Sequence, residues 1–420
     1  MTARIEVLHF GPFQSSALKM SRIDDNSLAY QELQPDQILT SVESLDYRCD
    51  GRLLALNSYE NRVYRIGRVD RSAIVAKFYR PGRWTDDAIL EEHQFSADLA
   101  QQEIPVLAPL VHNGKTLHRH GEFRFAVYQY RGGRSPELDN MELLRQLGRL
   151  VARIHRLGEA HPFHDRPKLD LSSFGEKSRD YLLESDFIPA ELRPAYTSVC
   201  EHLFSGMRGC YARADDPPGI RLHGDFHPSN VLIAGSTLHI VDLDDARMGP
   251  PVQDLWMFLS GDRDEQTPQL QELLAGYTEF RPFDARQLHL IEALRTLRIM
   301  HYAAWLAKRW QDPAFRIAFP WFNAPRYWDE HVLALREQAA LMEEEPLVYW
   351  DSTNQQQLSG MHFDWSMQKG KAPSSVKPTI LRPKRSPSRP ATILPTIPRP
   401  PPKTTIAAYS PGLQPSSFRV

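Results

Sequence analysis

Residues 221–245 constrain the fold of this chain more than any other stretch. An apolar run ends at Leu222, a polar loop follows over residues 223–230, and apolar residues resume at 231–233 and again at 238–241. This order of apolar and polar residues predicts a strand, a loop and then further strand. The polar side chains that these strands would hold in place carry oxygen, and they are Asp225, Asn230 and Asp242.

Such side chains suit the transfer of a phosphoryl group. One carboxylate can accept the proton of an attacking hydroxyl, whereas an amide oxygen and a second carboxylate suit a hard cation such as Mg²⁺. Phosphoryl transfer otherwise needs little more than positioning. A zinc site at His223 and His227 is the alternative, but no cysteine or further histidine lies at a useful spacing.

The spacing of the loop also resembles a known family. His-Gly-Asp at 223–225 is followed by Asn230 after five residues and by Asp242 after twelve more. This resembles the catalytic and metal loops of the aminoglycoside-phosphotransferase-like kinases. More narrowly, the chain from 33 to 348 resembles the bacterial stress response kinases, which are Ser/Thr protein kinases of that superfamily, in the stretches 56–64, 77–84, 89–93, 241–247 and 253–257.

The resemblance implies an α+β fold with the two lobes of a protein kinase. We expect an N-terminal extension at 1–32, a small β-rich N-lobe at 33–131, a larger α-helical C-lobe at 132–348 and a disordered, proline-rich tail at 349–420. Strong helical periodicity at 141–157 and 292–310 supports the helical C-lobe.

The resemblance assigns the roles in the loop. Asp225 would orient and deprotonate the hydroxyl of the substrate, and Asn230 and Asp242 would hold Mg²⁺. His223 would support the loop through its own hydrogen bonds, and Asp254 would brace it through hydrogen bonds to the backbone. Asp244 is expected to stabilise the loop or meet the substrate, with assistance to the metal as the alternative.

The N-lobe would bind ATP. Two apolar runs over residues 52–64 flank a loop without glycine, in which Ser58 and Asn61 would contact phosphates; an ordinary hairpin is the alternative. Lys77 interrupts a β-branched and aromatic run and fits the strand lysine that binds the α- and β-phosphates. At the end of the last N-lobe strand, Gln129 and Tyr130 would form the hinge, where adenine binds to the backbone.

A glutamate is the expected partner of Lys77. Thr85 followed by two aspartates predicts the start of a helix, because a hydroxyl caps it and acids favour its positive end. Glu91 and Glu92 both lie on this helix. The spacing typical of the family favours Glu92 as the partner and leaves Glu91 as the alternative.

Charge is divided unevenly along the chain. The net charge is −2, but residues 366–420 hold ten basic residues and no acidic one, so residues 1–365 carry −12. An acidic body argues against nucleic acid as the main partner. The basic segment also holds 12 of the 33 prolines, which predicts a solvated, disordered tail.

The sequence also indicates the cellular compartment. The sequence has no run of 18 apolar residues, so we expect no membrane span, and its start lacks a signal peptide. Met20 is an alternative start to Met1. Three scattered cysteines fit free thiols in a reducing cytoplasm, and we expect a cytoplasmic monomer.

Three functions remain open at this point. The first is an ATP- and Mg²⁺-dependent Ser/Thr protein kinase acting in a bacterial stress response. The second is a small-molecule kinase that phosphorylates a hydroxyl of an amino alcohol, sugar or aminoglycoside. The third is a catalytically silent nucleotide-binding scaffold, against which the intact set of Lys77, Asp225, Asn230 and Asp242 argues.

Overall fold

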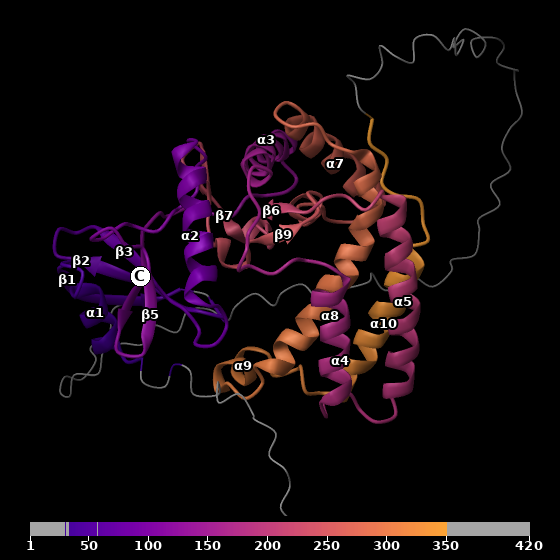
Figure 1. The fold of residues 1–420 in the computed structure, drawn as a ribbon, viewed down its shortest axis with the longest axis horizontal. Coiled ribbons are helices and arrows are strands. Elements are labelled where there is room, and N and C mark those ends of the chain that lie inside the picture. The colour runs from indigo at the N-terminus through magenta and orange to yellow at the C-terminus, as the bar shows by residue number, and fades with distance from the viewer. Residues whose placement is uncertain (1–29, 31–32, 57, 351–420) are drawn as a thin grey trace, which may run out of the picture. The chain divides into compact units, whose positions relative to one another are not determined.

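The computed structural model describes residues 30, 33–56 and 58–350 (Figure 1). The predicted N-terminal extension, apart from Tyr30, and the predicted tail from residue 351 onward lie outside the described residues. The choice between Met1 and Met20 as the start lies outside them as well.

A five-stranded antiparallel sheet forms the first part of the fold. Its strand order is β1-β2-β3-β5-β4, with the strands β1 (Cys49–Ala55), β2 (Arg62–Arg68), β3 (Ala73–Phe78), β4 (His118–His120) and β5 (Phe123–Gln129). The predicted strand, loop and strand at 52–64 are β1, β2 and their connection. Lys77 lies in β3 and pairs in register with Ala126 of β5.

Two helices belong to this part, although the sequence predicted one. The additional helix is α1 (Pro35–Glu43), which has proline at its first turn and buries Ile38 and Val42. It packs with alternate residues of β3, among them Phe78, on one face of the sheet. The predicted helix is α2 (Asp86–Gln101), and Ile89 packs with Tyr79 and Ala126 in a separate cluster. Alternation along β3 thus gives each helix a different set of partners.

The start of α2 follows the sequence closely. The Thr85 hydroxyl accepts a hydrogen bond from the Ala88 N–H at 3.1 Å, and Asp86 and Asp87 occupy the first turn. Ala88, Phe95 and Leu99 are buried at helical spacing and form the inward face of α2. The cap and the apolar face together fix which side of α2 faces the sheet.

The rest of the described chain is mainly helical and contains two short antiparallel sheets of two strands each. Only one of these pairs is a hairpin of consecutive strands, in which β7 (Val231–Ala234) pairs with β8 (Thr237–Ile240); in the other, β6 (Ile220–Leu222) pairs with the distant β9 (Arg247–Gly249). The helices are α3 (Met141–Gly158), α4 (Lys177–Glu184), α5 (Arg193–Arg213), α6 (Gln253–Trp256), α7 (Arg263–Thr278), α8 (Ile291–Lys308), α9 (Pro313–Ala318) and α10 (Pro325–Leu341). A β-rich part followed by a helical part confirms the predicted fold class.

Short irregular helices complete the helical part. They are a π-helix at Leu171–Glu176 and 3₁₀-helices at Pro228–Asn230, Leu243–Asp245 and Ala285–Leu290. Two of them, Pro228–Asn230 and Leu243–Asp245, lie in the loop that carries the candidate site. Among the described residues, none of the helices combines the length and the apolar character that a membrane crossing requires.

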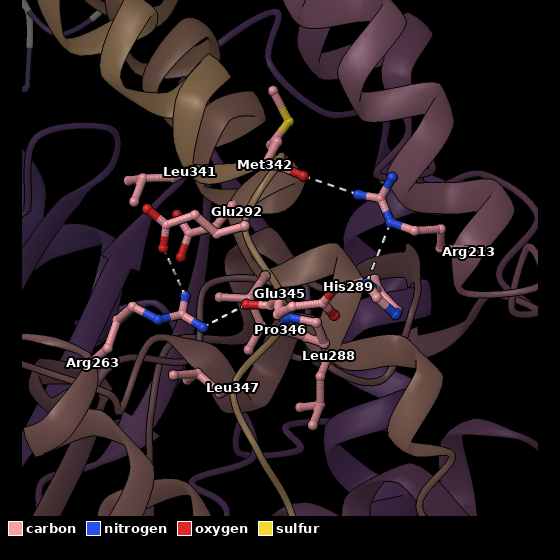
Figure 2. A pocket seen from close by; sticks show the side chains of 12 residues that line it. Arg213, Arg263, Leu288, His289, Glu292, Leu341, Met342, Glu345, Pro346 and Leu347 are labelled. Carbon is pink, nitrogen blue, oxygen red and sulfur yellow. Dashed lines mark hydrogen bonds and ion pairs between the residues drawn. The ribbon is translucent and has the colours of Figure 1, made fainter.

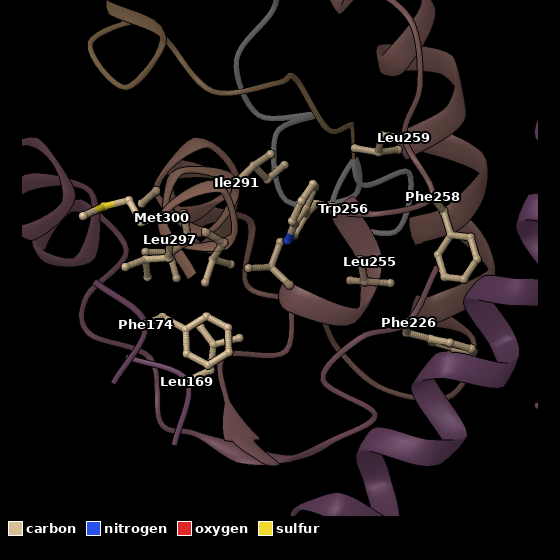
Figure 3. Close-up of a cluster of buried hydrophobic side chains, with 14 of the residues drawn as sticks. Leu169, Phe174, Phe226, Leu255, Trp256, Phe258, Leu259, Ile291, Leu297 and Met300 are labelled. Carbon is tan, nitrogen blue, oxygen red and sulfur yellow. The ribbon is translucent and has the colours of Figure 1, made fainter. Parts of the chain in front are cut away.

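Buried aromatic and aliphatic side chains form the core beside the polar loop (Figure 3). Phe226 is fully buried, and its ring meets that of Phe258 edge-on at 5.1 Å between centroids. Leu255 and Trp256 of α6 belong to the same core. Burial of one such phenylalanine stabilises a fold by about 1.5–3 kcal/mol, so Phe226 fixes the backbone directly after Asp225.

A small pocket of about 20 Å³ lies where residues 341–347 cross other helices (Figure 2). Arg213 donates to the Met342 carbonyl at 2.9 Å, and Arg263 lies 3.5 Å from the Glu344 carboxylate. The volume is close to what one water molecule needs. These arginines therefore fasten the end of the described chain to the helical part, and none of the residues lining the pocket belongs to the polar loop.

Candidate active site

Asp254 holds the backbone of the His-Gly-Asp motif. Its buried carboxylate accepts the N–H of His223 at 2.8 Å and the N–H of Gly224 at 2.9 Å. Gly224 has φ +82°, and a Cβ there would lie 2.3 Å from the Asp245 carbonyl oxygen. Only glycine meets both requirements. His155 of α3 is buried and lies 3.3 Å from Asp254 Oδ2 through Nε2.

Hydrogen bonds join the successive turns of the loop. His223 Nε2 lies 3.0 Å from the Val241 carbonyl oxygen, and the Val241 N–H donates to the Asn230 carbonyl at 3.0 Å. The Asn230 side-chain amide donates to the Asp225 carbonyl at 2.9 Å. The loop therefore brings Asp225, Asn230 and the residue before Asp242 together as one hydrogen-bonded unit.

Lys77 reaches the same loop from β3. Its Nζ lies 3.0 Å from Asp242 Oδ1 and 3.1 Å from Asp244 Oδ1. The side chain of Lys77 is 7% exposed, whereas that of Asp242 is 52% exposed. Burial by itself would lower the pKa of Lys77, but the two carboxylates outweigh burial and hold its pKa well above the usual value.

The expected ion pair between Lys77 and Glu92 is absent from the described residues. Lys77 makes its ion pairs with Asp242 and Asp244 instead, because these carboxylates lie within 3.1 Å of Nζ. Glu92 is buried and receives a long hydrogen bond from Ser96 Oγ at 3.4 Å. Burial raises the pKa of Glu92 to about 7, although Lys77 and Arg166 act in the opposite direction.

Glu91 has a structural partner of its own. Its carboxylate accepts the N–H groups of His164 at 2.6 Å, Asp165 at 2.9 Å and Arg166 at 3.1 Å. Arg166 in turn donates to the carbonyls of Asp244 and Ala246. Glu91 therefore fixes a turn that holds the segment after Asp242, and it is not a solvated residue.

Three arginines with no predicted role hold the carboxylates of the loop. Arg83, between β3 and α2, forms ion pairs with Asp244 and Asp245, and Arg247 also binds Asp245. Burial would raise the pKa of Asp244, but Arg83 and Lys77 hold it well below the usual range. Arg83 and Arg247 both lie within the sequence stretches that carry the family resemblance, which was the available signal.

The third arginine binds the predicted catalytic residue. Arg298 of α8 forms an ion pair with Asp225 Oδ1, and His227 Nε2 lies 3.4 Å from Asp225 Oδ2. Burial would raise the pKa of Asp225, but Arg298 and then His227 hold it well below the usual range. Asp225 therefore carries its charge at neutral pH. The helical pattern around Arg298 predicted only a core helix and gave no signal of this contact.

The remaining predicted nucleotide contacts lie along the sheet. Asn61 is buried, and its side-chain oxygen accepts the Arg80 N–H at 3.2 Å, so it braces the chain beside it. Ser58 is half-buried. Gln129 ends β5 and is exposed, and the guanidinium of Arg65 lies 4.3 Å from the ring centroid of Tyr130.

The donors in the loop fit a magnesium ion. Asp242 is half-exposed in a left-handed turn with φ 62°, and Asn230 uses its amide nitrogen on Asp225, so its oxygen remains for a ligand. No cluster of three or more metal-binding His, Cys, Asp or Glu side chains occurs in the described part of the chain. The Asp242 carboxylate and the Asn230 amide oxygen suit Mg²⁺, which binds through one or two protein oxygens together with water and phosphate oxygens.

Comparison with known proteins places the chain in a family. Residues 52–291 match the phosphotransferase enzyme family, and the chain belongs to that family. Within it, the chain is similar to stress response kinase A of Escherichia coli K12, with 42% identity over 325 residues that cover 77% of this chain and 98% of the relative. A protein of Salmonella typhimurium, named serine/threonine protein kinase RdoA, is 40% identical over the same shares.

Solved structures show the same fold. A complex of amicoumacin kinase with AMP-PNP, Ca²⁺ and its ligand has a TM-score of 0.57 and 18% identity, and it covers 76% of this chain and 97% of the kinase. A microcompartment-associated aminopropanol kinase has a TM-score of 0.55 and 17% identity, with 73% and 96% covered. At these identities the similarity concerns the fold alone.

The contact between Arg298 and Asp225 predicts a change in pH dependence. Removal of the cation in Arg298→Gln should raise the pKa of Asp225, because the guanidinium favours the ionised form. The acid limb of kcat/KM should therefore move to higher pH. A pH–rate profile measures this shift, and Arg326→Gln, which breaks an exposed pair on α10, serves as the control. An unchanged acid limb in Arg298→Gln would contradict the prediction.

The buried Glu92 predicts a change in stability with pH. Its folded pKa of about 7 lies above the usual 4.5, so the folded protein binds a proton more tightly than the unfolded chain. Stability should fall as pH rises from about 4.5 to 7. Glu92→Gln should remove this loss of folding stability, which amounts to at most about 3 kcal/mol. Relative to the wild type, the free energy of unfolding of the variant should therefore be higher at pH 8 than at pH 5. Denaturant unfolding at pH 5 and pH 8 tests this, with Glu330→Gln, a change at an exposed position of α10, as the control.

Proposed function

We propose that this chain is an ATP- and Mg²⁺-dependent Ser/Thr protein kinase. The observation that carries the proposal is the contact of Lys77 with Asp242 at 3.0 Å, between segments 165 residues apart. The same loop holds Asn230 to the Asp225 carbonyl at 2.9 Å. These residues supply a cationic phosphate contact, oxygen ligands and a carboxylate base, which together meet the needs of phosphoryl transfer.

Asp225 would act on the substrate hydroxyl. Its low pKa keeps it ionised, so its main contribution is to orient the hydroxyl and accept the proton as the new phosphate bond forms. Asp254 and the buried Phe226 hold the backbone on both sides of it. Arg298 would leave Asp225 or share it when the hydroxyl binds, since both require the same carboxylate.

Asn230 and Asp242 would hold Mg²⁺, which neutralises phosphate charge when bound. Asp242 is the more important ligand because it carries charge and is half-exposed, whereas Asn230 is neutral. Lys77 would bind the α- and β-phosphates of ATP. The connection between β1 and β2, with Ser58 and Asn61, would cover the phosphates, and the backbone at Gln129 and Tyr130 would bind adenine.

The nature of the acceptor separates two candidates. The relative named serine/threonine protein kinase RdoA supports a protein hydroxyl, and its 40% identity extends over 98% of its length. The amicoumacin and aminopropanol kinases with the same fold favour a small hydroxyl compound as the second candidate. We propose the protein substrate because the similarity to the stress response kinases is far closer.

Replacement of the proposed base predicts loss of transfer without loss of binding. Asp225→Asn should keep the fold and ATP affinity but reduce phosphoryl transfer by about 10²-fold or more, because an amide cannot accept the proton. The assay uses labelled ATP, Mg²⁺ and a generic protein acceptor, with detection of labelled Ser or Thr. Asp329→Asn on exposed α10 is the control. Turnover near that of the control would contradict the role of Asp225.

The same assay tests the acceptor. Parallel reactions with amino alcohols and aminoglycosides but no protein should give no labelled small molecule. Label transferred only to these compounds would favour the second candidate and leave the role of Asp225 intact.

Replacement of the proposed metal ligands predicts a graded effect. Asp242→Ala should abolish Mg²⁺-dependent ATP binding, because the phosphates lose their neutralising ion. Asn230→Ala should weaken binding less, because water can replace one neutral ligand. Calorimetry with and without Mg²⁺ measures both. Normal Mg-ATP binding by Asp242→Ala would mean that another residue is the principal ligand.

A further inference from the structure

Glu60 lies in the connection between β1 and β2, yet its contacts come from distant parts of the chain. Trp305 of α8 donates its indole N–H to Glu60 Oε2 at 2.6 Å. Arg309, directly after α8, donates to Glu60 Oε1 at 2.8 Å and lies 2.5 Å from Oε2 through Nε. Arg80, directly after Tyr79 at the end of β3, approaches Oε1 at 3.1 Å. Three donor side chains thus surround one carboxylate that is only 9% exposed.

A second set of contacts joins the same loop to the residues that flank α9 on either side. The ring of Tyr59 packs against Phe319 at 4.8 Å between centroids. Arg80 donates to the carbonyl oxygens of Tyr59 at 3.3 Å and Glu60 at 3.0 Å, and also to Asp312 at 2.9 Å. We refer to Tyr59, Glu60, Arg80, Trp305, Arg309 and Asp312 together as the loop latch.

The contacts of the loop latch go beyond those that a hairpin connection requires. A hairpin connection usually lies at the surface and satisfies its own backbone groups. Here a carboxylate is withdrawn from water, which costs free energy unless its partners are in place, and removal of one partner of such a group is strongly unfavourable. The loop therefore has a defined attached arrangement, and it can leave α8 only when several contacts break together.

We propose that Glu60 is a positioning residue, which through Trp305 and Arg309 fixes the β1–β2 connection over the bound nucleotide. Release of ADP then requires the loop latch to open. This inference rests on the proposed function, because it takes the connection as the cover of the ATP phosphates. It adds that two residues at the end of α8, remote in sequence, govern how long the nucleotide stays bound.

Two substitutions test the latch with different risks. Glu60→Gln removes the negative charge that Trp305, Arg309 and Arg80 contact. Trp305→Phe removes one donor and keeps a ring for packing against Phe315 and Phe319. Trp328→Phe is the matched control, because Trp328 is buried but its indole N–H has no hydrogen-bond partner. If Glu60→Gln fails to fold, Trp305→Phe still decides the question.

The first measurement is the dissociation rate of a fluorescent ADP analogue from the full chain in stopped flow. Trp305→Phe and Glu60→Gln should each release it faster, by roughly tenfold, since a hydrogen bond to a charged group contributes about that factor. KM for ATP should rise more than kcat falls, whereas Trp328→Phe should match the wild type. Release at the wild-type rate in both latch variants would overturn the proposal, even if their unfolding midpoints fell.

The second measurement needs no nucleotide. Amide hydrogen exchange over residues 58–66 should be faster in the latch variants than in Trp328→Phe. Failure of the wild type to bind ADP, together with latch-dependent protection, would refute the proposed function and with it the role in release, but would retain the attachment. Unchanged protection and unchanged release would refute the latch while the kinase assignment stands.

Discussion

The buried ammonium of Lys77 and its two carboxylates join the sheet to the polar loop. A charge that is 7% exposed must be paired, because an isolated buried ammonium is costly. The partners, Asp242 and Asp244, follow β8 and are separated from Lys77 by more than 160 residues. The position of the Lys77 ammonium and the positions of the two carboxylates therefore depend on each other. The sheet positions the cation, the hydrogen bonds of the loop position the acids, and the contact fixes the distance between them.

Local patterns in the sequence predicted the parts of the site that depend on nearby residues. The polar loop between apolar runs, the strand around Lys77 and the helix that begins after Thr85 are each encoded within a few residues, and the structure contains all three. The fold class was implied by the family resemblance, with support from the helical periodicity at 141–157 and 292–310. The short α1 was missed, because nine residues with two buried apolar positions give little periodicity.

Contacts between distant segments could not be predicted in this way. The helical pattern near Arg298 shows which face is buried but not that a guanidinium 73 residues from Asp225 will bind it. The expected ion pair of Glu92 with Lys77 does not occur among the described residues for a similar reason, since Asp242 and Asp244 come within 3.1 Å of the ammonium from a distant part of the chain. Glu91 and Glu92 are adjacent and point in different directions on a helix. Only the turn at 164–166 reveals that Glu91 has backbone partners.

The arginines decide which carboxylate remains open. Asp244 and Asp245 are held by Arg83, a bidentate partner whose charge is permanent, and Asp245 also by Arg247. Asp242 forms an ion pair only with Lys77 within the described part of the chain, and it is half-exposed. A metal ion held by Asp242 would compete with one ammonium, whose charge phosphate oxygens could bind in turn, whereas a metal ion at Asp244 would compete with two buried cations, Lys77 and Arg83. This difference supports the proposal that Asp242 is the metal ligand, while Asp244 and Asp245 make the ion pairs that hold the loop.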